Sequence, residues 1–215
     1  MEPVTLEEAK GWYADADPVH DFDHVQRVTR LAEKLAKAEG ADLRIVRTAA
    51  LLHDSWGSAP GGDGEDRAGH HIASALFAQD VLRQKGWPEE DIAAVQHCIR
   101  AHRYRGNEDE PETLEAKVLF DADKLDVLGA IGAARTIAYA ALDGQPAYAE
   151  PSERFLETGE KEPGEPHSSY HEFLFKLRHV KERIYTESGK ALAKTRHAYL
   201  MGFYEQLQAE VRGER

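Results

Sequence analysis

A chain of 215 residues with a formal net charge of -12 can bury a substantial core without disulfide staples. So acidic a protein is poorly suited to coating nucleic acid or an anionic membrane, which leaves a small molecule as the expected partner and self-association open. Its single cysteine, Cys98, excludes an internal disulfide framework. The first residues do not resemble a signal peptide and no apolar stretch approaches the length of a membrane span, so we expect a cytoplasmic protein.

Apolar residues recur at intervals of three and four along most of the chain, which predicts an all-α fold. Thr5 and Glu8 form a capping-box pattern at the start of the first helix, Gly40 ends the second, and Asp42 caps the third. In chain order, the expected helices span 5–14, 21–39, 42 to about 53, 70–85, 88 to about 102, 112–128, 133–142, 168–186 and 188–211.

Two loops interrupt this pattern. Residues 55–69 are polar and rich in glycine, and residues 143–166 contain several prolines. The helices after the second loop are amphipathic, so we expect them to bury an apolar face. The prediction is therefore one domain over 1–215, with the C-terminal helices (about 168–211) packed on the same core.

A histidine and an aspartate end the third expected helix. His53-Asp54 directly follows the apolar run 45–52, where a buried face should continue. Burying an imidazole and a carboxylate without partners is costly. A metal ion supplies a partner for both, because it binds neutral imidazole and ionised carboxylate together.

Two further residues of the same kind lie on inward helix faces. His24 precedes Val28 by four residues, and Asp123 follows Leu119 by four. A single such histidine is more often a hydrogen-bonded core residue, but three helices here deliver four polar groups to one interior. Two imidazoles and two carboxylates suit a divalent cation other than Ca²⁺, with Mn, Mg, Ni, Co or Fe as the candidates.

Two longer stretches resemble a known family. Residues 20–28 read His-Asp-Phe-Asp-His-Val-Gln-Arg-Val and resemble the HD-x-x-H-x-x-R-V opening of a bacterial subgroup of the HD superfamily of metal-dependent phosphohydrolases. Residues 121–132 resemble that subgroup's DAD-[RK]-LD-x-x-GAIG stretch. Lys176-Leu177, Thr186 and Arg196-His197 also fit its C-terminal helices, so the likeness spans roughly residues 18 to 210.

The resemblance implies an HD-domain helical bundle with an interior metal site. Carried over to this sequence, the family's metal ligands are His24, His53, Asp54 and Asp123. Asp123 is preferred to Asp121 because it directly precedes the basic residue, and because Asp121 would face elsewhere on the helix. We expect one bound ion rather than two, since only these four positions match strongly.

Other residues are candidates for catalysis or substrate binding. Asp54 could take a proton from water as well as bind metal, and Lys124 follows a ligand directly and could reach a phosphate. Arg27, one turn after His24, could hold a ligand carboxylate or bind phosphate. His20, His70 and His102 are expected substrate contacts. Asp126 could pair with Arg27, and Trp56 could stack on a base.

The favoured function is metal-dependent hydrolysis of a phosphate ester or anhydride in a nucleotide, with a nucleoside triphosphate as the leading substrate. One alternative is an HD-fold di-iron oxygenase, in which His71 or His70, and His97 or His102, supply two more ligands. Another is a catalytically inactive nucleotide-binding sensor. Oxygen consumption by iron-loaded protein would identify the first alternative, and nucleotide binding without turnover the second.

Overall fold

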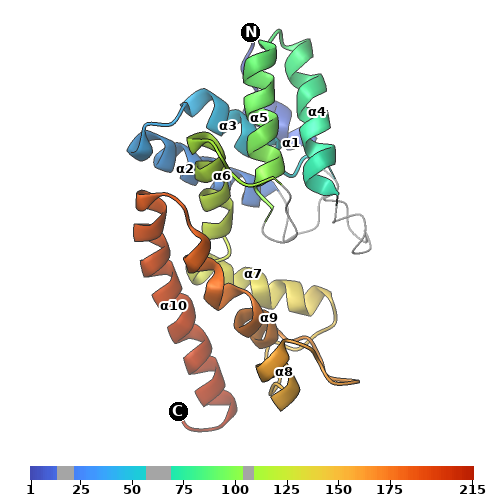
Figure 1. Cartoon of the computed structure of the whole chain (residues 1–215). Helices are drawn as coiled ribbons and strands as arrows, with labels where there is room; N and C mark the ends of the chain where they lie inside the picture. Colours follow the sequence, from blue (N-terminus) through green and yellow to red (C-terminus); the bar gives the residue numbers. More distant parts are fainter. Residues whose placement is uncertain (14–21, 57–68, 104–108) are drawn as a thin grey trace. The chain divides into compact units, whose positions relative to one another are not determined.

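The computed structural model describes residues 1–13, 22–56, 69–103 and 109–215, so the predicted substrate contact His20 lies outside the described residues. These residues form helices and no strand (Figure 1), which confirms the all-α prediction. The elements are α1 (Leu6–Gly11), α2 (Phe22–Glu39), α3 (Leu43–Leu52), α4 (His70–Gln84), α5 (Glu89–Ala101), α6 (Leu114–Leu125), α7 (Gly129–Leu142), α8 (Glu153–Thr158), α9 (Ser169–Phe175), the 3-10 helix η2 (Leu177–Arg183) and α10 (Glu187–Val211).

The predicted start and stop signals set the ends of the first three helices. The Thr5 hydroxyl accepts a hydrogen bond from the backbone N–H of Glu8, whose carboxylate accepts from the backbone N–H of Thr5. Gly40 adopts a φ of 78°, a left-handed conformation that ends α2. The Asp42 carboxylate accepts from the first backbone N–H groups of α3.

Residues 143–166, predicted as a loop, contain the six-residue helix α8. The Ser152 hydroxyl caps it by accepting from the backbone N–H of Phe155, and Gly159 ends it with a φ of 75°. Both signals are present in the sequence. A helix of less than two turns, however, shows too few apolar repeats to be recognised by periodicity.

The predicted helix over 168–186 was wrong in its length, because it divides into α9 and η2 at Lys176. The chain then becomes extended at Ile184, where ψ is 131°. An extended backbone leaves the next N–H groups without intrahelical partners. The N–H of Thr186 donates instead to the buried carboxylate of Asp121, at 2.7 Å.

The described chain divides into two compact units. Unit 1 comprises Met1–Lys124 and Tyr185–Gly189, and unit 2 comprises Leu125–Ile184 and Lys190–Arg215. Helix α3 lies at the centre of unit 1, where it contacts α1, α2, α4 and α5 (Figure 1). Most of its side chains are fully buried, so the residue that follows it is held firmly inside the unit.

In unit 2, α7 packs on α9, and the rings of Phe173 and Tyr204 stack with centroids 4.3 Å apart. That the C-terminal helices share one core with the rest of the chain stays a prediction. No single helix in the described part of the chain is both long and apolar enough to cross a membrane, although α6 and α7 meet these criteria when taken together as a bent pair.

Candidate metal centre

His53 stands at the C-cap of α3 with one ring nitrogen fixed and the other available. Its Nδ1 lies 2.8 Å from the carbonyl oxygen of Ala50, one of the carbonyls that a helix end leaves without a partner. A carbonyl only accepts, so Nδ1 carries the proton and Nε2 presents a lone pair. Nε2 is buried and has no hydrogen-bond partner within the described part of the chain. This is the state in which histidine binds a metal ion.

His102 repeats the arrangement at the C-cap of α5. Its Nδ1 lies 2.5 Å from the carbonyl oxygen of Ile99, again three residues earlier. The ring is almost completely buried, and its centroid lies 5.2 Å from that of His53. Two helix ends therefore present two imidazoles, each with its Nε2 directed away from its own helix, to the same interior.

The Asp54 carboxylate lies between two pairs of imidazoles. Its Oδ2 is 3.4 Å from Nε2 of His53 and 3.8 Å from Nε2 of His24. Its Oδ1 is 3.4 Å from Nε2 of His102 and 3.6 Å from Nε2 of His70. One carboxylate thus faces a different pair of imidazoles with each oxygen.

Helix α6 adds a second carboxylate and a cation. Oδ1 of Asp123 lies 3.4 Å from Nε2 of His24, and its Oδ2 accepts a hydrogen bond of 2.5 Å from the ammonium group of Lys124. The Lys124 ammonium also lies 5.4 Å from the centre of the Phe120 ring. Contact with both groups holds the Lys124 side chain at the edge of the cluster rather than in open solvent.

The electrostatics keep the carboxylates ionised and His53 neutral. Burial lowers the pKa of His53 from 6.5 to about 4. Burial alone would raise the pKa of Asp54, but the neighbouring imidazoles, led by His53, outweigh it and hold that pKa well below its ordinary value. The pKa of Asp123 is lowered in the same way, with burial opposed chiefly by Lys124. These are the protonation states that a divalent cation requires of its ligands.

The spacing of the ligand atoms fits a bound ion better than a hydrogen-bond network. The imidazole-to-carboxylate distances of 3.4–3.8 Å exceed those of good hydrogen bonds. Two atoms that each lie about 2.1 Å from a shared ion, at tetrahedral or octahedral angles, are separated by about 3.0–3.4 Å. Three of the five distances are 3.4 Å, and the other two are 3.6 and 3.8 Å. Two groups of donors form, and all donor atoms in each lie within 4.8 Å of one another: His24, His53 and Asp123, and Asp54, His70 and His102.

The structure thus brings together the four expected ligands, together with His70, His102 and Lys124. The approach of His70 and His102 to Asp54 differs from our expectation of a single-ion site, because it makes a second group of three donors. Periodicity could not reveal this, since His70 begins α4 and His102 follows α5. The available signal was that both, like His53, stand at a helix end. Arg27 is partly buried on α2, three residues after His24.

Two acidic residues of the 121–132 stretch lie in other contacts. The Asp121 carboxylate accepts from the backbone N–H of Tyr185 and from both the N–H and hydroxyl of Thr186, as its expected orientation away from Asp123 requires. Asp126, a possible partner of Arg27 in the sequence, accepts a hydrogen bond of 2.6 Å from Arg135. Asp121 therefore joins sequence-distant segments of unit 1.

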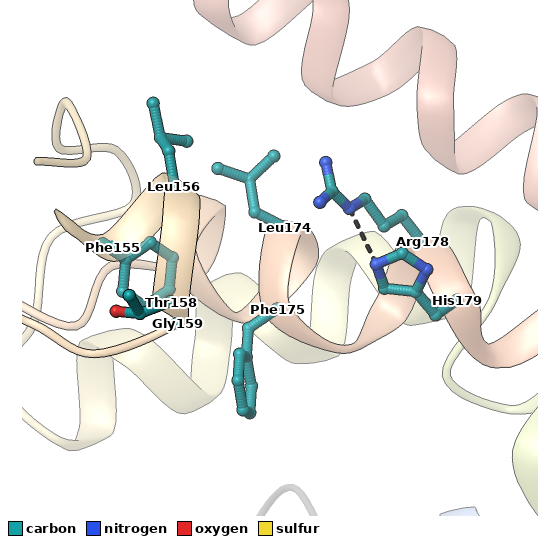
Figure 2. Close-up of a pocket in the computed structure, with 8 residues that line it drawn as sticks. All are labelled: Phe155, Leu156, Thr158, Gly159, Leu174, Phe175, Arg178 and His179. Carbon is teal, nitrogen blue, oxygen red and sulfur yellow. Dashed lines mark hydrogen bonds between the residues drawn. The ribbon is translucent and has the colours of Figure 1, made fainter. Parts of the chain in front are cut away.

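A hollow within unit 2 contains none of the predicted site residues. It is lined by side chains of α8, α9 and η2, and Figure 2 shows the Arg178 guanidinium directed at the His179 ring. Nε of Arg178 donates to Nε2 of His179 at 3.0 Å. Only two of its lining side chains are basic and none is acidic, so it offers no ligand set comparable with that around Asp54.

Comparison with known proteins links this geometry to a family. The model of the HD domain matches residues 21–128, the segment that carries all six ligand candidates. YpgQ of Bacillus subtilis, an uncharacterised protein, is 31% identical over 203 residues, covering 93% of this chain and 88% of YpgQ. Its crystal structure in complex with ADP matches with a TM-score of 0.73 at 28% identity and covers 98% of this chain and all of that one.

A second solved structure carries a functional name. An HD-superfamily hydrolase from Bacillus thuringiensis matches with a TM-score of 0.69 at 28% identity, covering 96% of this chain and 94% of that chain. The HD-domain match extends over half of the sequence, and the likeness to YpgQ extends over nearly all of it. The matched segment contains His53-Asp54 and the ligand candidates that surround them. The chain therefore belongs to the HD-domain family.

Proposed function

We propose that this protein is a metal-dependent phosphohydrolase that cleaves a phosphate ester or anhydride in a nucleotide, most favourably a nucleoside triphosphate. The observation that carries the proposal is the Asp54 carboxylate, which faces two imidazoles with each oxygen. Such an arrangement suits two divalent cations that share one carboxylate. Two-ion sites of this kind are typical of enzymes that hydrolyse phosphate bonds.

The assignment of ligands follows from the two groups of donors. His24, His53 and Asp123 would hold one ion and His70 and His102 the other, and Asp54 lies within reach of both groups. When bound, the ions polarise a phosphoryl oxygen and lower the pKa of water. The candidates Mn, Mg, Ni, Co and Fe all accept imidazole and carboxylate ligands, and the donor set does not select among them.

The protein's own side chains prepare the site. Backbone carbonyls fix the tautomers of His53 and His102, so neither ring reorients when an ion enters. Lys124, now bonded to Asp123, can turn its ammonium toward a phosphate oxygen and neutralise charge that builds there. The low pKa of Asp54 suits a bridging ligand better than a proton acceptor, because a general base works best with a pKa near the working pH.

Support for a nucleotide comes from two sources. The chain resembles nucleotide pyrophosphohydrolases in its extended motifs, and YpgQ has been crystallised in complex with ADP. With a net charge of -12, the protein as a whole repels an anion, so the ions and Lys124 must supply the local attraction for phosphate. Arg27 is proposed to support the site through His24 or its neighbouring carboxylates, and His20 to contact substrate.

The decisive experiment is a hydrolysis screen of nucleoside triphosphates, diphosphates and simple phosphoesters with each candidate metal, with phosphate and pyrophosphate resolved as products. We expect turnover of at least one nucleotide. Lys124→Ala should then lower kcat by about tenfold or more while metal content stays near that of the parent protein. Lys117→Ala, on the same helix two turns earlier, is the matched control and should behave as the parent.

Two outcomes would replace the proposal. Six ligands also match the number in HD-fold di-iron oxygenases, so oxygen consumption by iron-loaded protein, without hydrolysis of any nucleotide, would favour that class. Tight nucleotide binding without turnover under any metal would favour a sensor. Equal turnover by Lys124→Ala and the parent protein would remove Lys124 from the catalytic residues but leave the hydrolase assignment standing.

A further inference from the structure

A large apolar side chain is held in solvent two residues after Asp54. The Trp56 side chain is 58% exposed, although its backbone is fixed. Its N–H donates to the hydroxyl of Ser74 at 3.2 Å, and that hydroxyl lies 3.4 Å from the Trp56 carbonyl oxygen. Ser74 is buried on α4, one turn after His70. The indole is therefore tied to the same helix as a proposed ligand, and its exposure is not the result of a loose chain.

Other aromatic rings support the indole. The Phe77 ring lies 6.1 Å from that of Trp56, with an angle of 33° between their planes. Trp12 packs edge-on against Phe77 from 5.4 Å. The three rings form a row with Trp56 as an exposed member. Aromatic contacts of this kind restrict ring orientation, so Trp56 presents a fixed flat surface.

The ligands nearest to Trp56 in the chain and on α4 are also the more exposed ones. The side chains of His24 and His53 are 2% and 0% exposed, whereas those of Asp54 and His70 are 15% and 23% exposed. Asp54 lies two residues before Trp56, and His70 lies one turn from the serine that fixes it. Trp56 is therefore joined to the two more exposed ligands through the chain and through α4.

We propose that Trp56 is the stacking platform for the base of the nucleotide substrate, an inference that rests on the proposed function. The exposed face of the indole suits the flat, weakly polar base and not the phosphates, which the cations attract. Stacking on an aromatic face discriminates little among bases. The site therefore accepts several nucleotides and favours purines, whose larger rings cover more of the indole.

The test compares a substrate that has a base with one that lacks it. For each protein, the KM for ATP is divided by the KM for inorganic tripolyphosphate. Trp56→Ala should raise this ratio about tenfold, the loss expected for one base–aromatic stack. Trp56→Phe keeps an aromatic face and should restore most of the affinity for ATP. An unchanged ratio in Trp56→Ala would overturn the inference even if the protein proves to be a nucleotide hydrolase.

A binding measurement separates this inference from the proposed activity. ADP added to the metal-loaded parent protein should quench tryptophan fluorescence, and the quenching should be lost in Trp56→Phe. Trp87→Phe is the matched control, because that indole is buried and its N–H donates to the Glu2 carbonyl. It should retain the quenching. Full quenching in Trp56→Phe would refute the platform. Loss of quenching would support it even if no nucleotide is hydrolysed, a result that would count against the hydrolase alone.

Discussion

Replacing Asp121 by asparagine should destabilise unit 1, because this carboxylate joins α6 to residues more than sixty positions later in the chain. Asp121 is fully buried. Its Oδ2 accepts from the N–H and hydroxyl of Thr186 at 2.7 and 2.6 Å, and its Oδ1 accepts from the N–H of Tyr185 at 2.9 Å. An asparagine has one acceptor oxygen in place of two. Its amide NH₂ must therefore face a donor.

The magnitude follows from counting these bonds. If the amide oxygen takes the position of Oδ2, only the bond from Tyr185 is lost, and two donors then face each other in a buried place. A hydrogen bond to a charged acceptor contributes about 1.5–3 kcal/mol, and a buried donor left unsatisfied costs about 1–3 kcal/mol. Burial raises the pKa of Asp121, so removing its charge recovers part of this loss. The expected decrease in the free energy of unfolding is about 2–3 kcal/mol.

Urea denaturation followed by circular dichroism measures this decrease. Thr186→Val removes the hydroxyl's bond to Asp121 and the bond that the same hydroxyl accepts from the N–H of Gly189, and it should cost about 2–3 kcal/mol. The double variant should cost less than the two single changes added, because both act on one contact. Asp80→Asn, an exposed change of the same kind on α4, is the control and should stay within about 0.5 kcal/mol of the parent. An Asp121→Asn protein as stable as this control would refute the reasoning.

Further predictions concern the ligands and the cysteine. Asp54→Ala should lose bound metal, measured by elemental analysis, with helix content nearly unchanged; full metal content would exclude Asp54 as a ligand. Because the pKa of His53 falls from 6.5 to about 4 on burial, only the unfolded chain binds the proton between these values. The metal-free protein should therefore lose up to about 3 kcal/mol of stability as the pH falls from 7 to 4, and a flat profile would contradict the burial argument. Cys98 is fully buried with a raised pKa, so a thiol reagent should label it only on unfolding, and rapid labelling of native protein would show that α5 opens.

Most of the fold followed from the sequence because its signals are local. Each of these signals acts within one helical turn, so it can be recognised without knowledge of tertiary contacts: the Thr5–Glu8 capping box, the left-handed Gly40 and the Asp42 cap. The end of η2 at the extended Ile184 could not be recognised in the sequence. It is accompanied by bonds from Tyr185 and Thr186 to Asp121, which lies more than sixty residues earlier in the chain. A periodic pattern in the sequence does not predict a contact between residues so far apart in the chain.

The candidate site divides in the same way. His24 and Asp123 were identified because a polar residue on an apolar helix face breaks a regular pattern. His70 and His102 stand at helix ends, where polar residues are ordinary, and only the packing of α4 against α5 brings both to Asp54. The sequence therefore predicted His24, His53, Asp54 and Asp123 as metal ligands, and it placed His70 and His102 among the possible substrate contacts.

The caps at the two ends of α3 limit how this protein can change during evolution. Asp42 fixes the first turn through its carboxylate, and its own N–H donates to Glu115 at 2.9 Å, while His53 closes the last turn on the Ala50 carbonyl. Inserting or deleting one residue between them would rotate His53 by about 100° and shift it by about 1.5 Å along the axis. His53 and Asp54, which move together, would then miss His24 and His102 on the neighbouring helices. Relatives that keep the same chemistry can therefore vary the residues of α3 but not their number, and length variation should collect in the loops.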